Sequence, residues 1–242
     1  MKNQIIFGVV VIFSVFFIGL TGAAAQGTAA AAEGDSIKVA GGGVSVKGWT
    51  GKVDANEAAK GMTLNNAKLD KDGKALHVTT GPATTYWNPS NTAKGDYTVS
   101  ATFLEPKYMN LNDHPHPYGI VIGGNDLGTD QASYLYCAAY GNGTFIVRGF
   151  GPKAFQMGGR APMANPAVGK AAGKDQPVTQ AIAVTVKGDK VSCSINNTVV
   201  ATYDKSAVVS AGKLKSTDGV FGIRFAHNTD ATVTGLKMTK AK

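Results

Sequence analysis

The chain has 242 residues, of which 24 are basic and 16 acidic, and its formal net charge is +8. A chain of this length fits one large domain better than two small ones. The basic side chains are scattered, mostly as lysines in turns such as residues 187–190, and no dense basic run with interleaved aromatic residues occurs. We therefore interpret the excess positive charge as a contribution to solubility and expect no nucleic-acid partner.

The N-terminus has the three parts of a cleavable signal peptide. Lys2 precedes an apolar stretch over residues 5–20, and the small residues 23–25 provide an Ala-x-Ala cleavage site. The mature protein is then exported, to the periplasm or the extracellular space, and would contact the membrane only through an uncleaved signal. The predicted parts of the chain are a signal peptide (1–25), a small-residue linker (26–36) and a β-sandwich domain (37–242).

Short runs of alternating apolar and polar residues recur between glycine, asparagine and aspartate turns along the rest of the chain. This spacing predicts an all-β fold, a two-sheet antiparallel β-sandwich, rather than alternating strands and helices. Tight hairpins are predicted at residues 141–143 and 196–197, because asparagine and glycine tolerate the positive φ of such turns. A short helical turn is predicted over residues 55–60. The predicted strands, in chain order, are residues 75–79, 97–104, 119–122, 133–140, 144–150, 181–187, 191–195, 199–203, 220–226 and 232–238.

Two of these strands have a clear buried face. Their apolar residues alternate with smaller or polar ones, so that every second side chain points to the core. Arg224 falls on the opposite face of its strand. The residues predicted to face the core are Ile182, Val184, Val186, Phe221, Ile223 and Phe225.

Two cysteines, Cys137 and Cys193, lie inside predicted strands. Disulfides persist in the compartments to which an exported protein is delivered. The sequence does not supply the Cα separation that a bridge requires. A disulfide between two strands and two buried free thiols therefore both remain open.

Residues 151–177 depart from the strand pattern. The segment is rich in glycine, proline, alanine and lysine and has no period. Connections of this length are uncommon in compact domains and are usually functional or flexible. We predict a long irregular loop, either a flap over the face of the sandwich or a flexible segment.

Four blocks of the sequence carry a resemblance to a known superfamily: residues 114–124 (HPHPYGIVIGG), 134–136, 143–148 and 218–228. With these blocks the chain resembles secreted bacterial domains of the concanavalin A-like lectin/glucanase superfamily. Within that superfamily it is most similar to laminin-G-like modules and to the 3-keto-disaccharide hydrolase-type domain. The resemblance implies a jelly-roll sandwich that binds a glycan, cleaves one or adheres to a surface.

The glutamates exclude one of these activities. Retaining glycanases of this superfamily carry two glutamates on one strand, in an E-x-D-x-(x)-E pattern, because one carboxylate attacks while the other protonates the leaving oxygen. The chain contains only Glu33, Glu57 and Glu105, and none lies in that pattern. We therefore exclude a glucanase of that type and assign no catalytic residue.

Glu105, His114 and His116 remain as candidates for acid-base groups. Glu105 comes directly after the predicted strand 97–104, and the alternation of that strand points its side chain toward the core. Burial at such a position can raise the pKa of a carboxyl. His114 and His116 are one residue apart, so that they would point the same way in an extended segment. The interpretation we favour is a rim carboxylate bonded to loop amides and two histidines that pack or form hydrogen bonds in their loop.

The metal candidates are His114, His116 and Asp126. Neutral imidazole is a common metal ligand, and His227 from a distant strand could join the two loop histidines. Residues 125–130 and 228–230 contain the oxygen ligands that calcium prefers, but such residues also populate ordinary turns. We assign no metal ion and expect no cofactor, with calcium as the alternative.

The aromatic residues carry most of the information about a ligand. Tyr134, Tyr136 and Tyr140 share one face of their strand, and we predict that the following hairpin places Phe145 and Val147 beside them. On an exposed face such a row would offer flat platforms for sugar rings, whereas turned inward it would be a core layer. Periodicity leaves both alternatives open because the other face is also apolar. The predicted ligand-binding residues are Trp87 and Tyr118, at the rim, with Tyr134, Tyr136 and Arg148.

These observations favour an exported, non-catalytic, lectin-like domain whose partner is a glycan or polysaccharide. The resemblance leaves two alternatives, a glycoside-acting hydrolase of the 3-keto-disaccharide hydrolase type and a structural or adhesive surface module. The sequence makes no prediction of the oligomeric state.

Overall fold

The computed structural model of the protein describes Met1 and residues 36–241, so that the signal peptide beyond Met1 and nearly all of the predicted linker lie outside the described residues. Two β-sheets make up most of the domain. The first sheet has the spatial order β1 (Gly43–Val44), β3 (Ala67–Asp72), β4 (Ala75–Thr80), β16 (Asp230–Lys240), β6 (Tyr97–Glu105), β12 (Val178–Lys187), β13 (Lys190–Ile195) and β14 (Thr198–Asp204). The second sheet has the order β10 (Ala154–Gln156), β9 (Thr144–Phe150), β8 (Ser133–Ala139), β7 (Tyr118–Asn125), β15 (Gly219–Phe225), β5 (Thr84–Ala93) and β2 (Thr50–Val53), and β11 (Met163–Ala164) also pairs with β9. The helical elements are α1 (Ala55–Ala58), α2 (Lys205–Val208) and the 3-10 turn η1 (Leu64–Asn66).

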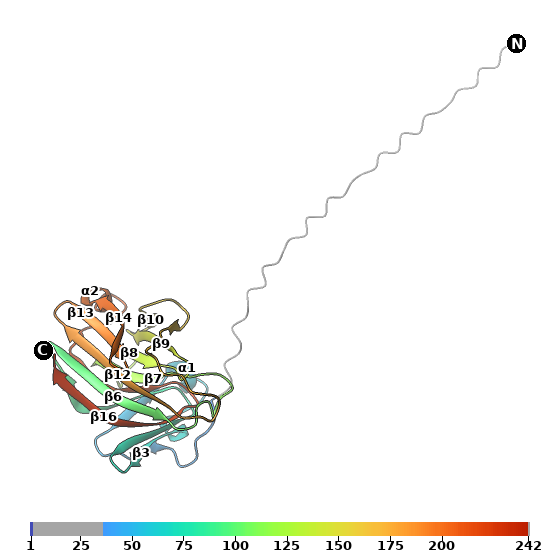
Figure 1. Cartoon of the computed structure of the whole chain (residues 1–242), viewed down its shortest axis with the longest axis horizontal. Coiled ribbons are helices and arrows are strands. Elements are labelled where there is room, and N and C mark those ends of the chain that lie inside the picture. Colours follow the sequence, from blue (N-terminus) through green and yellow to red (C-terminus); the bar gives the residue numbers. More distant parts are fainter. Residues whose placement is uncertain (2–35, 242) are drawn as a thin grey trace. The chain divides into compact units, whose positions relative to one another are not determined.

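The two sheets stack as a β-sandwich, with β6, β12 and β16 in one layer and β7, β8 and β9 in the other (Figure 1). Neighbouring strands are antiparallel except for β1 and β3, which pair in parallel. The predicted all-β sandwich is therefore confirmed, and its curled sheets form a jelly roll.

Each strand predicted from the sequence corresponds to a strand of the structure. Ile182, Val184 and Val186 of β12 are buried, as their alternation requires. The hairpin between β13 and β14 has the two-residue loop Asn196-Asn197, and both residues have positive φ (49° and 66°). This is the backbone geometry that matches the right-handed twist of the two strands.

The sequence pattern did not reveal β5, a strand of the second sheet. Its first four residues are buried, but the strand continues through Asn88-Pro89-Ser90-Asn91, which has the composition of a turn. β5 pairs with β2 through residues 84–87, and it pairs with β15 both through these residues and through Thr92 and Ala93. Residues 88–91 span the register shift between the two stretches paired with β15, so pairing on either side of them carries the strand across a turn-like segment.

The core fills the space between the sheets and contains both cysteines. Cys137 of β8 and Cys193 of β13 form a disulfide with a Cα–Cα separation of 6.0 Å. The alternative that the sequence left open is therefore decided in favour of a bridge. Because β8 and β13 belong to different sheets, this bond ties the two layers together across the core.

Residues 151–177 extend the edge of the second sheet. Strands β10 and β11 both pair with β9, and Met157 is buried in the core. Phe155 and Met163 pack against the same core, and Gly158 lies next to Tyr203 of β14. Apart from these two short strands the segment is irregular, as predicted, and its apolar side chains anchor it to the core at the edge of the second sheet, where it is part of the sandwich.

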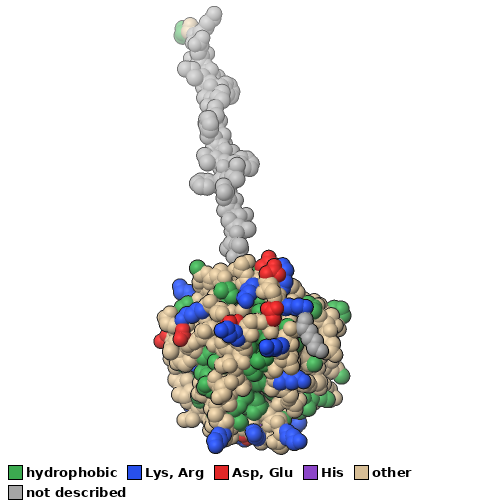
Figure 2. All heavy atoms as spheres, turned by 90° about the vertical axis from the view of Figure 1, so that its left-hand side faces the viewer, with side chains coloured by type: hydrophobic (Ala, Val, Ile, Leu, Met, Phe, Trp, Pro, Cys, Tyr) green, Lys and Arg blue, Asp and Glu red, His purple; other side chains and the backbone are tan. Residues whose placement is uncertain are grey.

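The surface shows no concentration of charge on the face seen in Figure 2, where basic side chains are dispersed among polar and apolar atoms. This agrees with the scattering of lysines in the sequence. Among the residues that the structure describes, no helix is long and apolar enough to span a bilayer.

The disulfide is expected to stabilise the sandwich by restricting the unfolded chain. It closes a loop across a sequence separation of 56 residues, for which chain-entropy estimates give about 4 kcal/mol, often with less realised in practice. Replacing Cys137 and Cys193 with alanine should lower the free energy of unfolding by about 2–4 kcal/mol. Urea denaturation of the variant, and of the parent with and without reductant, measures this loss. Equal stability of all three samples would contradict the role assigned to the bond.

Candidate functional site

The second sheet is apolar on both faces. Its inner face belongs to the core, while a separate group of buried side chains lies on its outer face. We call this group the outer-face cluster. It consists of Trp87, Val121, Leu127, Tyr134, Tyr136, Ala138 and Ile146.

The hairpin between β8 and β9 determines which side chains join this cluster. Tyr136 pairs with Arg148 and Tyr134 with Phe150, so each pair shares the outer face. The predicted placement of Phe145 and Val147 beside the tyrosines is therefore wrong, since both lie in the inner core. The reason is the turn, which holds three residues between Tyr140 and Thr144 and shifts the register by one.

Arg224 of β15 lies beneath the outer-face cluster and is buried. Its two terminal nitrogens donate to the two carboxylate oxygens of Asp54 at 2.7 and 2.5 Å. Burial alone would lower the pKa of Arg224, but the Asp54 carboxylate raises it well above its usual value, so the guanidinium stays charged. The guanidinium carbon lies 5.0 Å from the ring centre of Tyr136 and 5.2 Å from that of Phe150, within cation-π range.

A pocket of about 270 Å³ opens beside this ion pair. Trp87, Leu127 and Phe150 form apolar parts of its wall. Its polar groups include Asp54, and also Thr85 and Tyr134, whose hydroxyls are 3.0 Å apart. Arg224 donates to both hydroxyl oxygens, at 2.9 and 3.2 Å, and so fixes their positions.

The rim of the pocket is charged. Lys52 donates to the carbonyl of Thr129 and pairs with Asp130 at 3.2 Å, which ties β2 to the turn after β7. The Asp130 side chain is 97% exposed. The pocket thus combines apolar walls, fixed hydroxyls at its base and carboxylates at its base and rim, which is the composition expected for a small polar ligand.

A second depression, of about 310 Å³, lies over the first sheet. Small and polar residues such as Ser100, Thr102, Ala183 and Ser194 line it, and none of its lining residues is aromatic. It lacks the flat apolar surface that the pocket on the second sheet provides.

Tyr118 is not at the rim of a binding site. It is fully buried in the core, with its ring centre 5.5 Å from that of Phe103 and 5.9 Å from that of Phe225. The prediction of Tyr118 as a ligand-binding residue is therefore corrected. It is the first residue of β7, and its parity turns it inward with Ile120 and Ile122.

Glu105 is the last residue of β6, and it points into the core as its parity predicted. Its carboxylate accepts a hydrogen bond from the Met109 amide at 3.1 Å and lies beside the Tyr118 hydroxyl. Burial raises the pKa of Glu105 to about 7, although the Met109 amide opposes this shift.

The two loop histidines of the sequence analysis lie together with His227, the third histidine that it named. One ring nitrogen from each of His114, His116 and His227 lies within 4.8 Å of the others. Glu57 of α1 approaches this group, with its carboxylate 3.7 Å from Nδ1 of His227. Burial lowers the pKa of His116 to about 4, so this ring is neutral at pH 7.

The other predicted residues have structural partners. Arg148 lies on the outer face, where it donates to the carbonyl of Arg160 at 3.2 Å. Asp126 occupies a turn with φ 53° and pairs with Lys215. Of the five predicted ligand-binding residues, Trp87 and Tyr134 line the pocket.

Sequence reasoning missed Asp54, Thr85 and Phe150 as parts of the site. Asp54 lies in a stretch where apolar and polar residues do not alternate regularly, and Thr85 belongs to strand β5, which the sequence pattern did not reveal. The signal that could have found the site was Arg224. An arginine on the non-core face of an otherwise apolar strand requires a carboxylate partner if that face is covered.

No protein-family model matches the sequence, and no curated protein matches it. Solved structures that are similar in three dimensions include the following three. The carbohydrate-binding module CBM66 from Bacillus subtilis has a TM-score of 0.53 and 9% identity, and the match covers 82% of this chain and 99% of that one. A protein with a galectin-like fold from Bacillus subtilis has a TM-score of 0.55 and 14% identity, over 81% and 90%. The endo-β-1,3-glucanase from Pyrococcus furiosus has a TM-score of 0.51 and 13% identity, over 83% and 90%.

The fold is a concanavalin A-like jelly roll. At these identities the similarity shows the fold alone, and this fold is shared by carbohydrate-binding modules and glycan-cleaving enzymes. The likeness to laminin-G-like and 3-keto-disaccharide hydrolase-type domains stays a prediction.

The ion pair beneath the pocket should contribute strongly to stability. Asp54→Asn leaves a buried guanidinium without its counter-charge, and such losses cost about 3–5 kcal/mol. The matched control is Asp130→Asn, because its exposed pair with Lys52 should be worth less than about 1 kcal/mol. Urea denaturation of both variants tests this. Equal, small losses of stability in the two variants would show that the buried charge of Arg224 does not require the Asp54 carboxylate.

Glu105 should make stability fall as pH rises. Its pKa is 4.5 in model compounds and about 7 in the folded chain, so the folded state binds more protons than the unfolded state between these values. The free energy of unfolding therefore decreases through this window, by up to about 3 kcal/mol for this group. Glu105→Gln should match the parent at pH 4 and exceed its stability at pH 8. Denaturation at both pH values is the measurement, and an unchanged difference between parent and variant would contradict it.

Proposed function

We propose that this protein is an exported carbohydrate-binding domain that holds a sugar in the pocket on the outer face of its second sheet. The observation that carries the proposal is the pocket itself, in which the Trp87 and Phe150 side chains adjoin the Asp54 carboxylate and the Thr85 and Tyr134 hydroxyls. The export signal is the sequence prediction, and the disulfide between Cys137 and Cys193 supports an oxidising compartment.

The aromatic walls suit the apolar faces of a sugar ring. A pyranose or furanose ring presents C–H groups on its faces and hydroxyls around its edge. Trp87 and Phe150 offer rigid surfaces for the former at a small cost in conformational entropy. Arg224 packs against Phe150 from below and keeps that ring in place.

The polar groups suit the hydroxyls at the edge of the ring. A carboxylate has about four acceptor sites, and Asp54 uses one on each oxygen for Arg224, which leaves others for a ligand. Thr85 and Tyr134 are held by Arg224 in fixed orientations. Preorganised partners of this kind reduce the entropy lost on binding.

The size of the pocket favours a short ligand. Its volume of about 270 Å³ lies just below the range for small-molecule pockets, about 300–1,000 Å³. This suits one sugar unit or the end of a chain better than an internal stretch of polysaccharide.

Binding is favoured over hydrolysis by the position of Glu105. The hydrolase alternative needs this carboxylate as an acid or base beside the histidines, within hydrogen-bond reach of a substrate. Glu105 instead lies in the core against Met109 and Tyr118 and is 5% exposed. The pocket has its carboxylates at Asp54 and Asp130, and Asp54 is committed to Arg224.

A glycan array probed with the purified protein tests the proposal. We expect selective retention of glycans that share a terminal sugar. Trp87→Ala and Phe150→Ala should each weaken binding by about 10-fold or more, because an aromatic side chain on which a ligand ring stacks contributes about 1–3 kcal/mol.

The chain contains two tryptophans, which supplies a matched control. Trp49 precedes β2 and packs against the inner core, on the other side of the sheet from Trp87. Trp49→Phe should bind glycans as the parent does, and its remaining fluorescence should respond to the ligand through Trp87. A folded parent that retains no glycan, or binding that survives both pocket variants, would overturn the proposal.

A further inference from the structure

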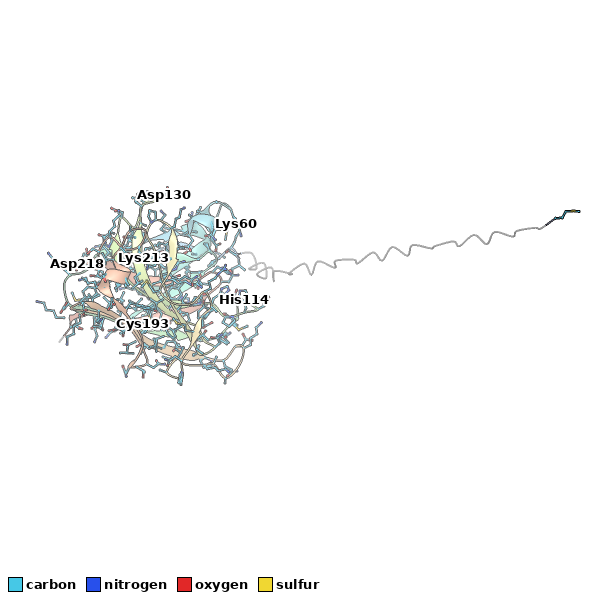
Figure 3. All side chains as sticks on the ribbon, turned by 90° about the horizontal axis from the view of Figure 1, so that it is seen from above. Lys60, His114, Asp130, Cys193, Lys213 and Asp218 are labelled. Carbon is cyan, nitrogen blue, oxygen red and sulfur yellow. A yellow bond between two sulfur atoms is a disulfide. The ribbon has the colours of Figure 1, made fainter. Side chains whose placement is uncertain are left out.

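Three of the four histidines of the chain meet at one end of the domain. His114 and His116 precede β7, and His227 follows β15, its neighbour in the second sheet. Their rings are tightly grouped, with the centre of His116 4.4 Å from that of His114 and 4.0 Å from that of His227. Figure 3 shows His114 far from Asp218, which precedes the opposite end of β15. The group is separate from the residues that line the pocket.

The Nδ1 atoms of these rings face oxygen atoms. Nδ1 of His114 contacts the Asp113 carboxylate, and the shortest contact of Nδ1 of His116 is with the carbonyl oxygen of His227. The amide nitrogen of Asn112 also lies 3.1 Å from Nδ1 of His116, but it donates to the carbonyl of Asn228. Nδ1 of His227 lies 3.7 Å from the Glu57 carboxylate. A carbonyl oxygen can only accept a hydrogen bond, and so can an ionised carboxylate, so Nδ1 carries the proton in His114 and in His116.

In a neutral ring this assignment fixes the other nitrogen. A neutral imidazole with a proton on Nδ1 has a lone pair on Nε2. The Nε2 atoms of His114 and His116 face each other at 2.7 Å. Two lone pairs at this separation repel each other unless a cation lies between or beside them.

We propose that His114, His116 and His227 bind a divalent transition-metal ion. Metal-ligating histidines characteristically donate their other ring N–H to a carboxylate or a backbone carbonyl, which fixes the tautomer and the ring orientation. Asp113 and the His227 carbonyl occupy these positions for His114 and His116. The Glu57 carboxylate lies near Nδ1 of His227, at 3.7 Å, which is an ion-pair contact beyond hydrogen-bond distance.

The support for these ligands extends into the fold. Glu57 is buried on α1, where it also accepts hydrogen bonds from the Ser36 hydroxyl and the Ala83 amide. Asn112 donates to the carbonyl of Asn228, which ties the loop before β7 to the segment after β15. The site is thus built on both strands at once, so that two of its ligands are fixed by packing.

The geometry leaves the ion accessible. His116 and His227 are buried, whereas the side chain of His114 is 42% exposed and can adjust. Bonds of about 2.0–2.1 Å to a tetrahedral ion place two nitrogens about 3.3 Å apart. The Nε2 atoms of His114 and His116 are 2.7 Å apart, and the ring nitrogens of the whole group lie within 4.8 Å of one another, so the rings have to shift when the ion binds. Three imidazoles leave at least one coordination position for water or for a ligand group.

The ligand type selects the class of metal. Imidazole suits zinc, copper, nickel and iron, whereas calcium and magnesium require oxygen ligands. The two cysteines are joined in the core disulfide, so thiolate does not compete for the ion. We therefore expect zinc or cobalt, rather than calcium, to bind here.

The test is a titration of the full chain, made without a polyhistidine tag and treated with a chelator, with Zn²⁺ and with Co²⁺. The parent should bind one equivalent of Zn²⁺ per chain, gain thermal stability from it, and give the visible absorption of a low-coordinate Co²⁺ site. His114→Ala should weaken Zn²⁺ binding by at least about 10-fold, the effect typical for the loss of a supporting interaction. Because His114 is half-exposed, this variant should still fold.

The fourth histidine is the matched control. His77 lies on the first sheet between Asp70 and Asp230, at 3.2 and 2.7 Å, away from the three-histidine group. His77→Ala should retain the stoichiometry, the Co²⁺ spectrum and the stabilisation by Zn²⁺. The proposal is overturned if the folded parent binds neither ion stoichiometrically, or if His77→Ala loses binding while His114→Ala keeps it. Either result would mean that a shared proton, and not a metal ion, holds the rings together.

Discussion

The ion pair of Arg224 with Asp54 is the contact on which the organisation of the second sheet depends. A buried guanidinium is unfavourable without a counter-charge and partners for its donors. Arg224 satisfies this requirement with a carboxylate, two hydroxyls and two aromatic rings. These partners come from β5, β8, β9 and the segment after β2, so that a single side chain orders residues from four parts of the sequence.

The segments that contain Asp54 and Arg224 also bring Glu57 next to His227. Asp54 accepts the first backbone hydrogen bonds of α1, from Glu57 and Ala58, and thereby positions Glu57. Three residues after Arg224, the chain reaches His227, which meets Glu57. The pocket and the three-histidine group therefore share a scaffold, although they present different chemistry. One offers aromatic rings and hydroxyls to a neutral polar ligand, and the other offers imidazoles to a cation.

The sandwich could be predicted from the sequence because its strands and turns are specified by neighbouring residues. Strand β12 shows its buried face by simple alternation, and Asn196-Asn197 specifies its own turn. The site is different, because its parts meet only in the folded chain. Alternation placed Arg224 on the non-core face, but its partner Asp54 is 170 residues away in a segment without a pattern.

Two further errors have equally specific causes. Gly141-Asn142-Gly143 predicts a turn but not whether it holds two residues or three, and one residue decides which face carries Tyr134 and Tyr136. Strand β5, which supplies Trp87 and Thr85, was not predicted because the residues that follow them have the composition of a turn. In contrast, the sequence suggested a group of His114 and His116 with His227 from a distant strand, and the structure brings the three rings together.

The central claim is that a sugar binds to the outer face of the second sheet. Amide chemical-shift mapping during titration with a glycan selected on the array tests it most directly. Our account predicts that the largest changes occur around Thr85, Trp87 and Phe150, which surround the pocket. Changes centred instead on Ser100, Thr102 and Ala183, in the depression over the first sheet, would contradict it.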